Sequence, residues 1–213
     1  MKNVWRDGVR RLLHPERGRE SFVLYTVLLS LILYLFLFCI LAVMPITGES
    51  IFRHDLFHQY APFLEELRSR LIEGRSLQFS FETGLGKSLL PQIAYYTASP
   101  LNLLALLFPA TWITPVMTGF IVAKLALAAG SFAYFLRWMS GKNHWAVMPF
   151  GLLYACSGFL SAYYWNVMWL DGTALFPLVA LGVERLLREG RSGLYLTALA
   201  LSIFCNFYLG FII

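Results

Sequence analysis

The residue best placed to do chemistry is Asp55, which follows His54 shortly after a long apolar stretch. This position predicts that its carboxylate lies at the boundary between membrane and water. A carboxylate there can act as a general base toward an acceptor hydroxyl, or it can bind a divalent cation. The alternative is an N-terminal helix cap, for which Asp is among the preferred residues. The two roles are compatible.

A second acid, Asp171, occurs in an otherwise apolar segment beside Trp169 and Gly172. An acidic residue at such a position is costly unless it is paired or functional. We interpret Asp171 as a second acidic site on the same side of the membrane as Asp55. The alternative is again a cap, here for the helix expected to follow.

A metal site is one interpretation of these residues. His54 and His58 are four residues apart, so both can lie on one face of a helix. Asp55, Asp171 and His58 are then the candidate ligands, and a divalent cation such as Mg²⁺ or Mn²⁺ is the possible cofactor. We expect no further His or Cys ligand on this side, so ordinary interfacial histidines are the alternative.

Basic residues offer sites for a phosphate group. Lys124 stands inside an apolar stretch, where it can pair with an acid or bind an anionic ligand, or else extend toward the membrane surface. Arg53 adds a cation close to Asp55. Other cations of the same region are Arg68, Arg70, Arg75 and Lys87, for most of which a solvated position is the simpler interpretation.

The segment 84–88 superficially resembles a nucleotide phosphate loop. The pattern GxxxxGK[ST] requires a glycine at position 81, where the chain has Phe81. The segment is also expected on the outer side of the membrane, away from cytoplasmic nucleotides. We therefore exclude a phosphate loop.

The composition is that of an integral membrane protein. Hydrophobic residues make up 58% of the chain and charged residues 14%, against about 25% charged in a soluble domain. The basic residues flank apolar stretches and form no stripe, which argues against a nucleic-acid partner. We expect an all-α, polytopic helical bundle in the bacterial cell membrane. The chain ends inside an apolar run, so we expect the N-terminal part of a longer protein.

Apolar stretches and their charged flanks predict five membrane spans. Residues 22–44 form the first, and the basic segment 1–21 places the N-terminus in the cytoplasm. Residues 45–114 are then a large extracytoplasmic loop, and 165–173 a short one. The remaining spans are predicted at 115–138, 145–165, 174–187 and 194–213. Tyr163, Tyr164, Trp165 and Trp169 suit an outer aromatic belt.

The large loop begins with a predicted amphipathic helix over about 55–73, which we expect on the membrane surface. Glu66 and Arg70 form an i,i+4 pair on its polar face, and Gly74 is a suitable end. The apolar segment 101–113 is too short to span a bilayer. The apolar face of the helix consists of Leu56, Tyr60, Phe63, Leu64, Leu67 and Leu71.

Several motifs together resemble a known family. The run from Asp55 to Phe63 reads DLFHQYAPF, and it is followed by Gly84-Leu85-Gly86, by Tyr95-Tyr96, by SPLNLL over 99–104 and by Ser157-Gly158-Phe159. This combination resembles the N-terminal part of the bacterial YfhO-type membrane proteins, a family that is similar to the GT-C glycosyltransferases.

The resemblance implies a GT-C-like enzyme that transfers a sugar from a polyprenyl-phosphate donor to a cell-envelope acceptor, such as lipoteichoic acid, on the outer face of the membrane. Asp55 matches the acidic residue that serves as base or metal ligand in the first outer loop of such enzymes, and Asp171 matches a second acidic site by topology. Lys124 and Arg53 are candidates for the donor phosphate. The alternatives are a transporter or lipid flippase, and a non-catalytic scaffold that binds envelope partners.

Overall fold

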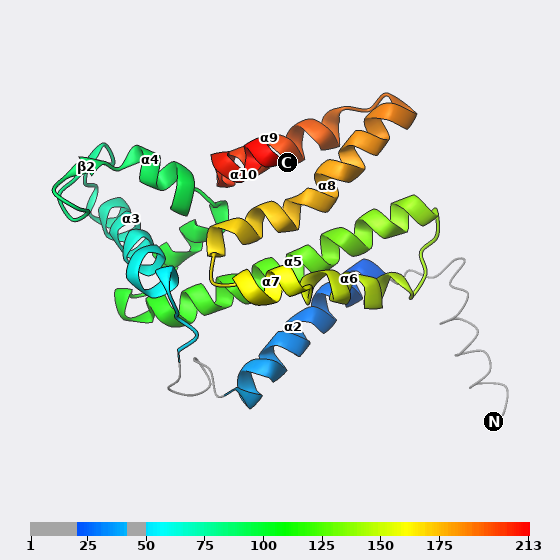
Figure 1. Ribbon diagram of the computed structural model, residues 1–213, viewed down its shortest axis with the longest axis horizontal. Helices are drawn as coiled ribbons and strands as arrows, with labels where there is room; N and C mark the ends of the chain where they lie inside the picture. The colour runs from blue at the N-terminus through cyan, green and yellow to red at the C-terminus, as the bar shows by residue number, and fades with distance from the viewer. Residues whose placement is uncertain (1–20, 42–49) are drawn as a thin grey trace.

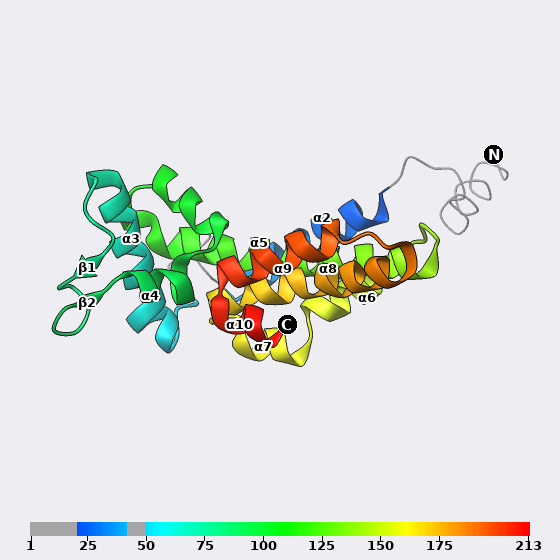
Figure 2. The ribbon, with the colours of Figure 1, turned by 90° about the horizontal axis from the view of Figure 1, so that it is seen from above.

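The computed structural model describes residues 21–41 and 50–213 (Figure 1). The predicted cytoplasmic segment up to residue 20 and the last part of the predicted first span lie outside these residues. The described chain is an elongated bundle of helices, with a smaller lobe of short elements at one end (Figures 1 and 2).

The bundle is built around helix α5 (Ile113–Ser140), which packs against α2 (Phe22–Ile40), α6 and α8 (Val167–Glu189). In the described part of the chain, three helical segments are long and apolar enough to cross a membrane: α2, Ala110–Ser140 and α8. Their side chains remain apolar on the outside of the bundle as well, which is typical of helices surrounded by lipid. The chain is therefore an α-helical membrane protein.

Helices α5 and α8 run in the same direction (Figure 1). Near one end Lys124 contacts Asp171, and near the other the Arg188 guanidinium lies 5.8 Å from the centre of the Trp138 ring. The chain returns between them through α6 (Val147–Ala155) and α7 (Gly158–Tyr163). Arg137, Lys142, Arg185, Arg188 and Arg191 therefore gather at the end opposite the small lobe.

Two of the predicted spans are interrupted. The third span consists of α6 and α7, which are separated at Cys156 and Ser157. The fifth consists of α9 (Gly193–Cys205) and α10 (Phe207–Ile212), separated at Asn206. Asn206 is extended there, and its side-chain oxygen accepts a hydrogen bond of 2.9 Å from the backbone of Leu209. The side chain thus caps the second short helix, which stabilises the break.

The predicted outer loop at 165–173 is wrong from Val167 onward, because α8 already begins there. Asp171 lies inside the helix and not ahead of it. Its charge is compatible with a helical, buried position because Lys124 neutralises it. The neighbouring Gly172 packs against Leu209 of α10.

Glycines allow close packing of the helices. A Cβ atom at Gly151 of α6 would lie 2.7 Å from the backbone oxygen of Ala129 in α5, and one at Gly182 would lie 2.5 Å from the Cα of Tyr195 in α9. Small residues at such contacts are typical of helix pairs in membranes. They allow α6 to pack closely on α5, and α9 on α8.

The small lobe follows α2 in the chain. It holds η1 (Leu56–Tyr60) and α3 (Ala61–Glu73), and Gly74 ends α3 in the left-handed conformation with φ 68°. A two-stranded hairpin, β1 (Phe79–Ser80) and β2 (Lys87–Ser88), comes next. The chain then returns to the bundle through α4 (Leu90–Gln92), η2 (Ile93–Thr97), η3 (Pro100–Leu107) and η4 (Ala110–Trp112).

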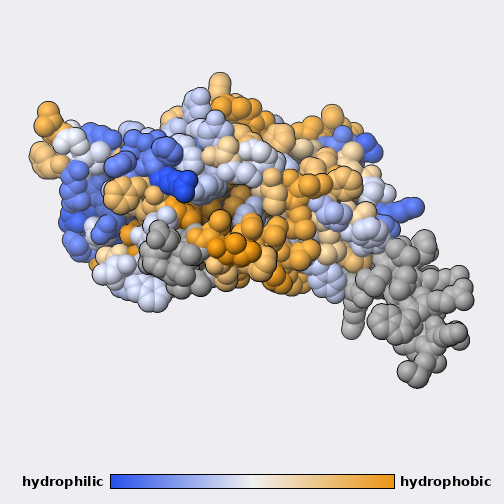
Figure 3. Space-filling view, turned by 60° about the horizontal axis from the view of Figure 1, so that its bottom comes forward, coloured by the Kyte–Doolittle hydropathy of each residue, from blue (hydrophilic) through white to orange (hydrophobic). Residues whose placement is uncertain are grey.

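The apolar face of η1 and α3 packs on the bundle, with Leu56, Tyr60 and Leu64 in the core beside Met117 of α5. The solvated position expected for Arg70 is wrong. Arg70 and Glu66 form the predicted pair at 3.0 Å, but both side chains are buried where the hairpin folds over α3. Figure 3 shows hydrophilic residues concentrated over this end and hydrophobic residues over the middle of the molecule.

Candidate functional site

Asp55 stands directly before η1 and is half-buried. Its side chain makes no capping hydrogen bond to the helix, although it occupies the cap position. The preceding residue, His54, has φ 49°, a left-handed conformation that is uncommon for residues other than glycine. The Asp55 carboxylate accepts a hydrogen bond of 3.4 Å from Gln59 Nε2, and it also interacts with the Tyr60 hydroxyl. The carboxylate is thus held at the end of the bundle without a structural bond to the backbone.

Aromatic residues connect Asp55 to the start of α8. The Tyr60 hydroxyl donates a hydrogen bond of 2.8 Å to Asn166 Oδ1, and the Tyr60 ring stacks on Trp165 with centroids 6.5 Å apart. The His54 ring lies 5.4 Å from Trp165. The side-chain nitrogen of Asn166 is buried and has no hydrogen-bond partner among the described residues. A buried donor without a partner can donate a hydrogen bond to an oxygen atom of a ligand.

The charge of Asp55 acts on the tyrosines around it. Burial raises the pKa of Tyr60, and the negative charge of Asp55 raises it further. Burial is the main cause that raises the pKa of Tyr96. The charges of the neighbouring Tyr95 and of Asp55 raise it further. Both hydroxyls therefore stay protonated at neutral pH. Within the described part of the chain, no Lys, Arg or His forms an ion pair with Asp55, so its carboxylate keeps an uncompensated charge.

A polar cleft lies next to Asp55, with a volume of about 530 Å³. Gln59 lies between the two, because it lines the cleft and also donates to the Asp55 carboxylate. Clefts of this size hold small polar ligands or a few units of a longer chain. The other lining residues are His58, Pro62, Phe63, Glu66, Glu82, Thr83, Gly84, Lys87 and Tyr96.

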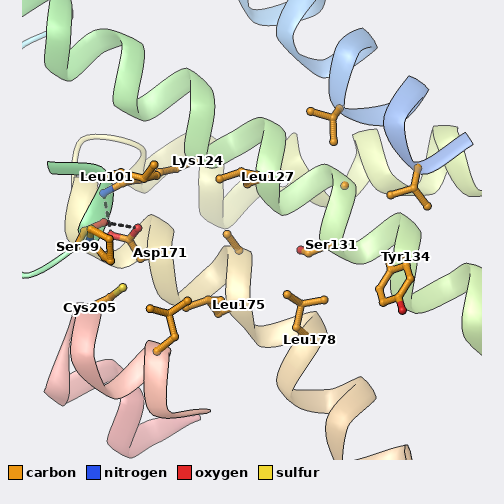
Figure 4. Close-up of a pocket in the computed structure, with 16 residues that line it drawn as sticks. Ser99, Leu101, Lys124, Leu127, Ser131, Tyr134, Asp171, Leu175, Leu178 and Cys205 are labelled. Atoms are coloured by element: carbon orange, nitrogen blue, oxygen red, sulfur yellow. Dashed lines mark hydrogen bonds and ion pairs between the residues drawn. The ribbon is translucent and has the colours of Figure 1, made fainter. Parts of the chain in front are cut away.

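Asp171 has entirely different surroundings (Figure 4). Its Oδ2 atom lies 2.7 Å from the Lys124 ammonium, and its Oδ1 atom accepts a hydrogen bond of 2.9 Å from Ser99. The ammonium also donates to the backbone oxygen of Val167, at 3.1 Å. Lys124, Asp171 and Ser99 are all buried. The cluster joins α5, α8 and the segment between η2 and η3.

An apolar groove of about 520 Å³ extends from this cluster along the bundle (Figure 4). Its walls come from α2, α5, α8 and α9, and it reaches Tyr134 at the far end. The residues that make it apolar include Val23, Val27, Leu127, Leu175, Leu178 and Leu201. Its length and polarity suit a hydrocarbon chain.

The structure brings Asp55 and Asp171 to the same end of the bundle, but into separate surroundings. Tyr60 of η1 contacts Asn166, and Asp171 lies only about 7.5 Å further along the axis of α8 at 1.5 Å per residue. Lys124 does not extend to the surface, because its side chain is 1% exposed and bound to Asp171. Arg53 is exposed and forms no ion pair among the described residues.

The possible metal site is not assembled in this structure. Among the described residues, no group of three or more His, Cys, Asp and Glu side chains is arranged to hold a metal ion. Asp171 is engaged by Lys124 and Ser99, and His58 lines the cleft instead. The acidic residues therefore do not act as one ligand set here.

Several residues of the site were not identified from the sequence as candidates. Ser99 belongs to the SPLNLL motif and Tyr96 to the Tyr95-Tyr96 pair, so the motifs did contain a signal for both. Gln59 follows Asp55 by one helical turn, which is the spacing for a side-chain contact. Asn166 had no such signal, because its contact with Tyr60 joins distant parts of the chain.

Comparison with known proteins gives one match. The sequence model of the family described as bacterial membrane protein YfhO matches residues 26–213. The match includes Asp55, the polar cleft, and the Lys124–Asp171 pair. A search of curated proteins and a search of solved structures each find no match.

Proposed function

The chain belongs to the YfhO family of bacterial membrane proteins, and from this premise we propose that it is part of a membrane glycosyltransferase. The proposed donor is a sugar linked to a polyprenyl phosphate, and the proposed acceptor is a cell-envelope polymer such as lipoteichoic acid. The reaction takes place on the outer face of the membrane. The N-terminus lies in the cytoplasm, in agreement with the basic residues at the end of the bundle opposite Asp55.

The observation that carries this proposal is the state of the Asp55 carboxylate. It has no ion-pair partner among the described residues, it makes no capping bond, and Gln59 links it to a polar cleft. These are the properties needed by a general base that must reach a hydroxyl group. A carboxylate with a purely structural role would be engaged like that of Asp171.

In the proposed mechanism, Asp55 accepts the proton from an acceptor hydroxyl. The hydroxyl oxygen attacks the anomeric carbon of the donor sugar and forms the new glycosidic bond. The bond between that carbon and the phosphate oxygen breaks, and polyprenyl phosphate leaves with the electron pair. This direct displacement inverts the anomeric centre. The buried amide nitrogen of Asn166 and the protonated Tyr96 are available to hold the sugar oxygens.

The donor lipid also needs a place for its chain and its phosphate. The groove that begins at the Lys124–Asp171 pair provides an apolar surface for the polyprenyl chain. We assign the phosphate to Arg53, which is exposed and has no ion pair among the described residues. Lys124 is engaged by Asp171, so we assign it a positioning role in place of direct phosphate binding.

Replacement of Asp55 by Asn in the full-length protein tests the catalytic role. We expect transfer of the lipid-linked sugar to fall by roughly 10²- to 10⁴-fold, because the amide cannot take up the proton. Asp55→Glu should keep part of the activity. Glu65→Gln is the matched control, since Glu65 is an exposed acid on the following helix. Full activity of Asp55→Asn would overturn the proposal.

A transporter or lipid flippase is the second candidate. It is favoured by the buried Lys124–Asp171 pair and by the helix breaks at Cys156 and Asn206, because transporters place charges and broken helices in their pathways. An assay in detergent micelles distinguishes the two functions. A glycosyltransferase still transfers sugar there, whereas transport across a membrane cannot take place. A non-catalytic scaffold would tolerate Asp55→Asn in both settings.

A further inference from the structure

We infer that a second apolar groove, between the small lobe and the end of α9, binds an acyl chain of a membrane phospholipid. The groove has a volume of about 610 Å³ and is distinct from the groove that begins at the Lys124–Asp171 pair. The two grooves adjoin at Ser99 and Pro100, which line both of them. The inference does not depend on the proposed function, because it concerns neither the sugar donor nor the acceptor.

The walls of the second groove come from two parts of the molecule. Leu71 of α3, Leu90 of α4 and Leu103 of η3 lie on the lobe side. Ile203 and Phe204 of α9 lie on the bundle side. Both ribbon views show α4 near the junction of α9 and α10 (Figures 1 and 2). The groove therefore lies where the lobe meets the bundle.

A buried hydrogen bond holds the two sides together. Asn206, at the break between α9 and α10, donates from Nδ2 to the backbone oxygen of Tyr95, at 2.8 Å. Asn206 is buried, and Tyr95 belongs to η2. The same short helix contributes Ile93 and Ala94 to the lining of the groove. The groove is thus a fixed feature of the fold.

The lining determines which ligand suits the groove. None of the lining residues is charged, and the polar ones, Thr97 and Ser99, are buried. Ser99 is also bound to Asp171. A sugar or a free phosphate would lose its bonds to water here without replacement, whereas a hydrocarbon chain loses none. A helix about 10 Å wide would exceed the volume of the groove within roughly two turns, so a spanning helix of another protein does not fit.

The groove is continuous with the surface of the bundle that faces lipid. Phe204 is 62% exposed, on an apolar helix of a membrane protein. On the lobe side Leu90 is 54% exposed, so apolar surface extends across the junction. Lipid tails are as apolar as leucine side chains. An acyl chain from the leaflet next to the lobe can therefore enter the groove without leaving apolar surroundings.

The charges near the lobe end of the groove do not select a headgroup. Leu71 and Leu77 line this end, and the exposed Glu73 and Arg75 lie between them in the chain. Arg75 is shared between Glu73, at 2.7 Å, and Glu82, at 3.0 Å. These opposite charges are already paired with each other. We therefore expect binding to depend on the acyl chain and not on the charge of the headgroup.

Photolabelling of the full-length protein in phosphatidylcholine nanodiscs tests the inference. The probe is phosphatidylcholine with a diazirine in one acyl chain, and mass spectrometry of peptides locates the label. Residues 90–103 and 203–207 should be labelled. Ala94→Trp fills the groove and should lower the labelling of 90–103 roughly tenfold, because lost contact with two methylene groups already weakens binding by about that factor.

Two further variants keep this test decisive. Leu103→Trp, at an exposed position on the opposite wall, should lower the labelling in the same way if Ala94→Trp disturbs folding. Ala200→Trp is the matched control, because Ala200 is exposed on α9 and lines neither groove. Labelling of 90–103 that is unchanged in both groove variants overturns the inference.

Three comparisons identify the occupant. Labelling of 90–103 should exceed that of the exposed Leu24 and Ile32 of α2, and equal labelling would show ordinary bilayer contact only, which overturns the inference. Phosphatidylglycerol as the host lipid should change nothing, and a dependence on headgroup charge would overturn the inference. Added polyprenyl phosphate should not compete, since competition would assign the groove to the sugar donor. No comparison uses sugar transfer, so the proposed function can fail while this site stands.

Discussion

Asp55 and Asp171 lie toward the same end of the bundle, but the protein uses them differently. Asp171 is buried, and both of its oxygens are bound, one by Lys124 and the other by Ser99. Asp55 is half-buried, and its carboxylate is contacted by Gln59, through a hydrogen bond of 3.4 Å, and by the neutral Tyr60 hydroxyl. Their surroundings, and not their residue type, separate a carboxylate that holds helices together from one that has no ion-pair partner among the described residues.

The difference also shows what each carboxylate connects. Asp171 joins α8 to α5 and to the segment before η3, so it positions the lobe on the bundle. Asp55 faces a cleft in the lobe itself, through Gln59. The proposed catalytic group thereby sits on a support whose position is fixed by a second, ion-paired acid. The two residues should respond in opposite ways to substitution, in stability and in activity.

The largest effect on stability is expected for Lys124→Met. This change leaves the Asp171 carboxylate buried without a counter-ion and should lower the free energy of unfolding by about 3–5 kcal/mol. Thermal unfolding of the purified protein in nanodiscs measures it. The double variant Lys124→Met/Asp171→Asn should recover most of the loss, since the pair is then uncharged. A single variant as stable as the wild type would contradict the structural role of the pair.

A smaller effect is expected for Ser99→Ala, which removes one hydrogen bond to the Asp171 carboxylate but keeps the ion pair. We expect a loss of about 1.5–3 kcal/mol, the range for a hydrogen bond to a charged group. The same unfolding measurement applies. Ser69→Ala is the comparison, because Ser69 is a half-buried serine that bonds neutral or exposed groups. Equal losses of unfolding free energy at the two serines would show that the hydrogen bond to the Asp171 carboxylate contributes no more than an ordinary hydrogen bond.

The smallest effect on stability is expected for Asp55→Asn. The carboxylate makes no cap and no ion pair among the described residues, so unfolding should shift by less than about 0.5 kcal/mol. This value matters when it is set against the large loss of activity proposed for the same variant. A destabilisation comparable to that of Lys124→Met would show that Asp55, like Asp171, stabilises the fold, and would contradict the proposed difference between the two residues.

Local patterns in the sequence predicted local structure well. The spacing of apolar residues predicted a helix over 55–73, and η1 and α3 occupy Leu56–Glu73 with Gly74 at the end. The i,i+4 spacing also predicted the Glu66–Arg70 pair. These features depend on residues within one or two turns of each other, where a single chain contains all the information.

Features that depend on contacts between distant parts of the chain could not be predicted from the sequence. Nothing near Lys124 or Asp171 indicates that the two form a pair, and without the pair a charged Asp171 was placed in a loop and not in the start of α8. Burial of Arg70 depends on the hairpin that folds back over α3, which its position in the helix does not reveal. The polar cleft needs both walls in place before its charges can be compared.

The two residues of the Lys124–Asp171 pair are synthesised one after the other. The two residues are 47 positions apart in the chain, so the lysine leaves the ribosome first. At about 5–20 residues per second, its partner follows roughly 2–10 s later. During this interval α5 carries an unpaired ammonium, which costs about 2.5–3.5 kcal/mol at the centre of an inserting helix. The apolar residues of α5 must offset that cost until α8 arrives and Asp171 neutralises the ammonium.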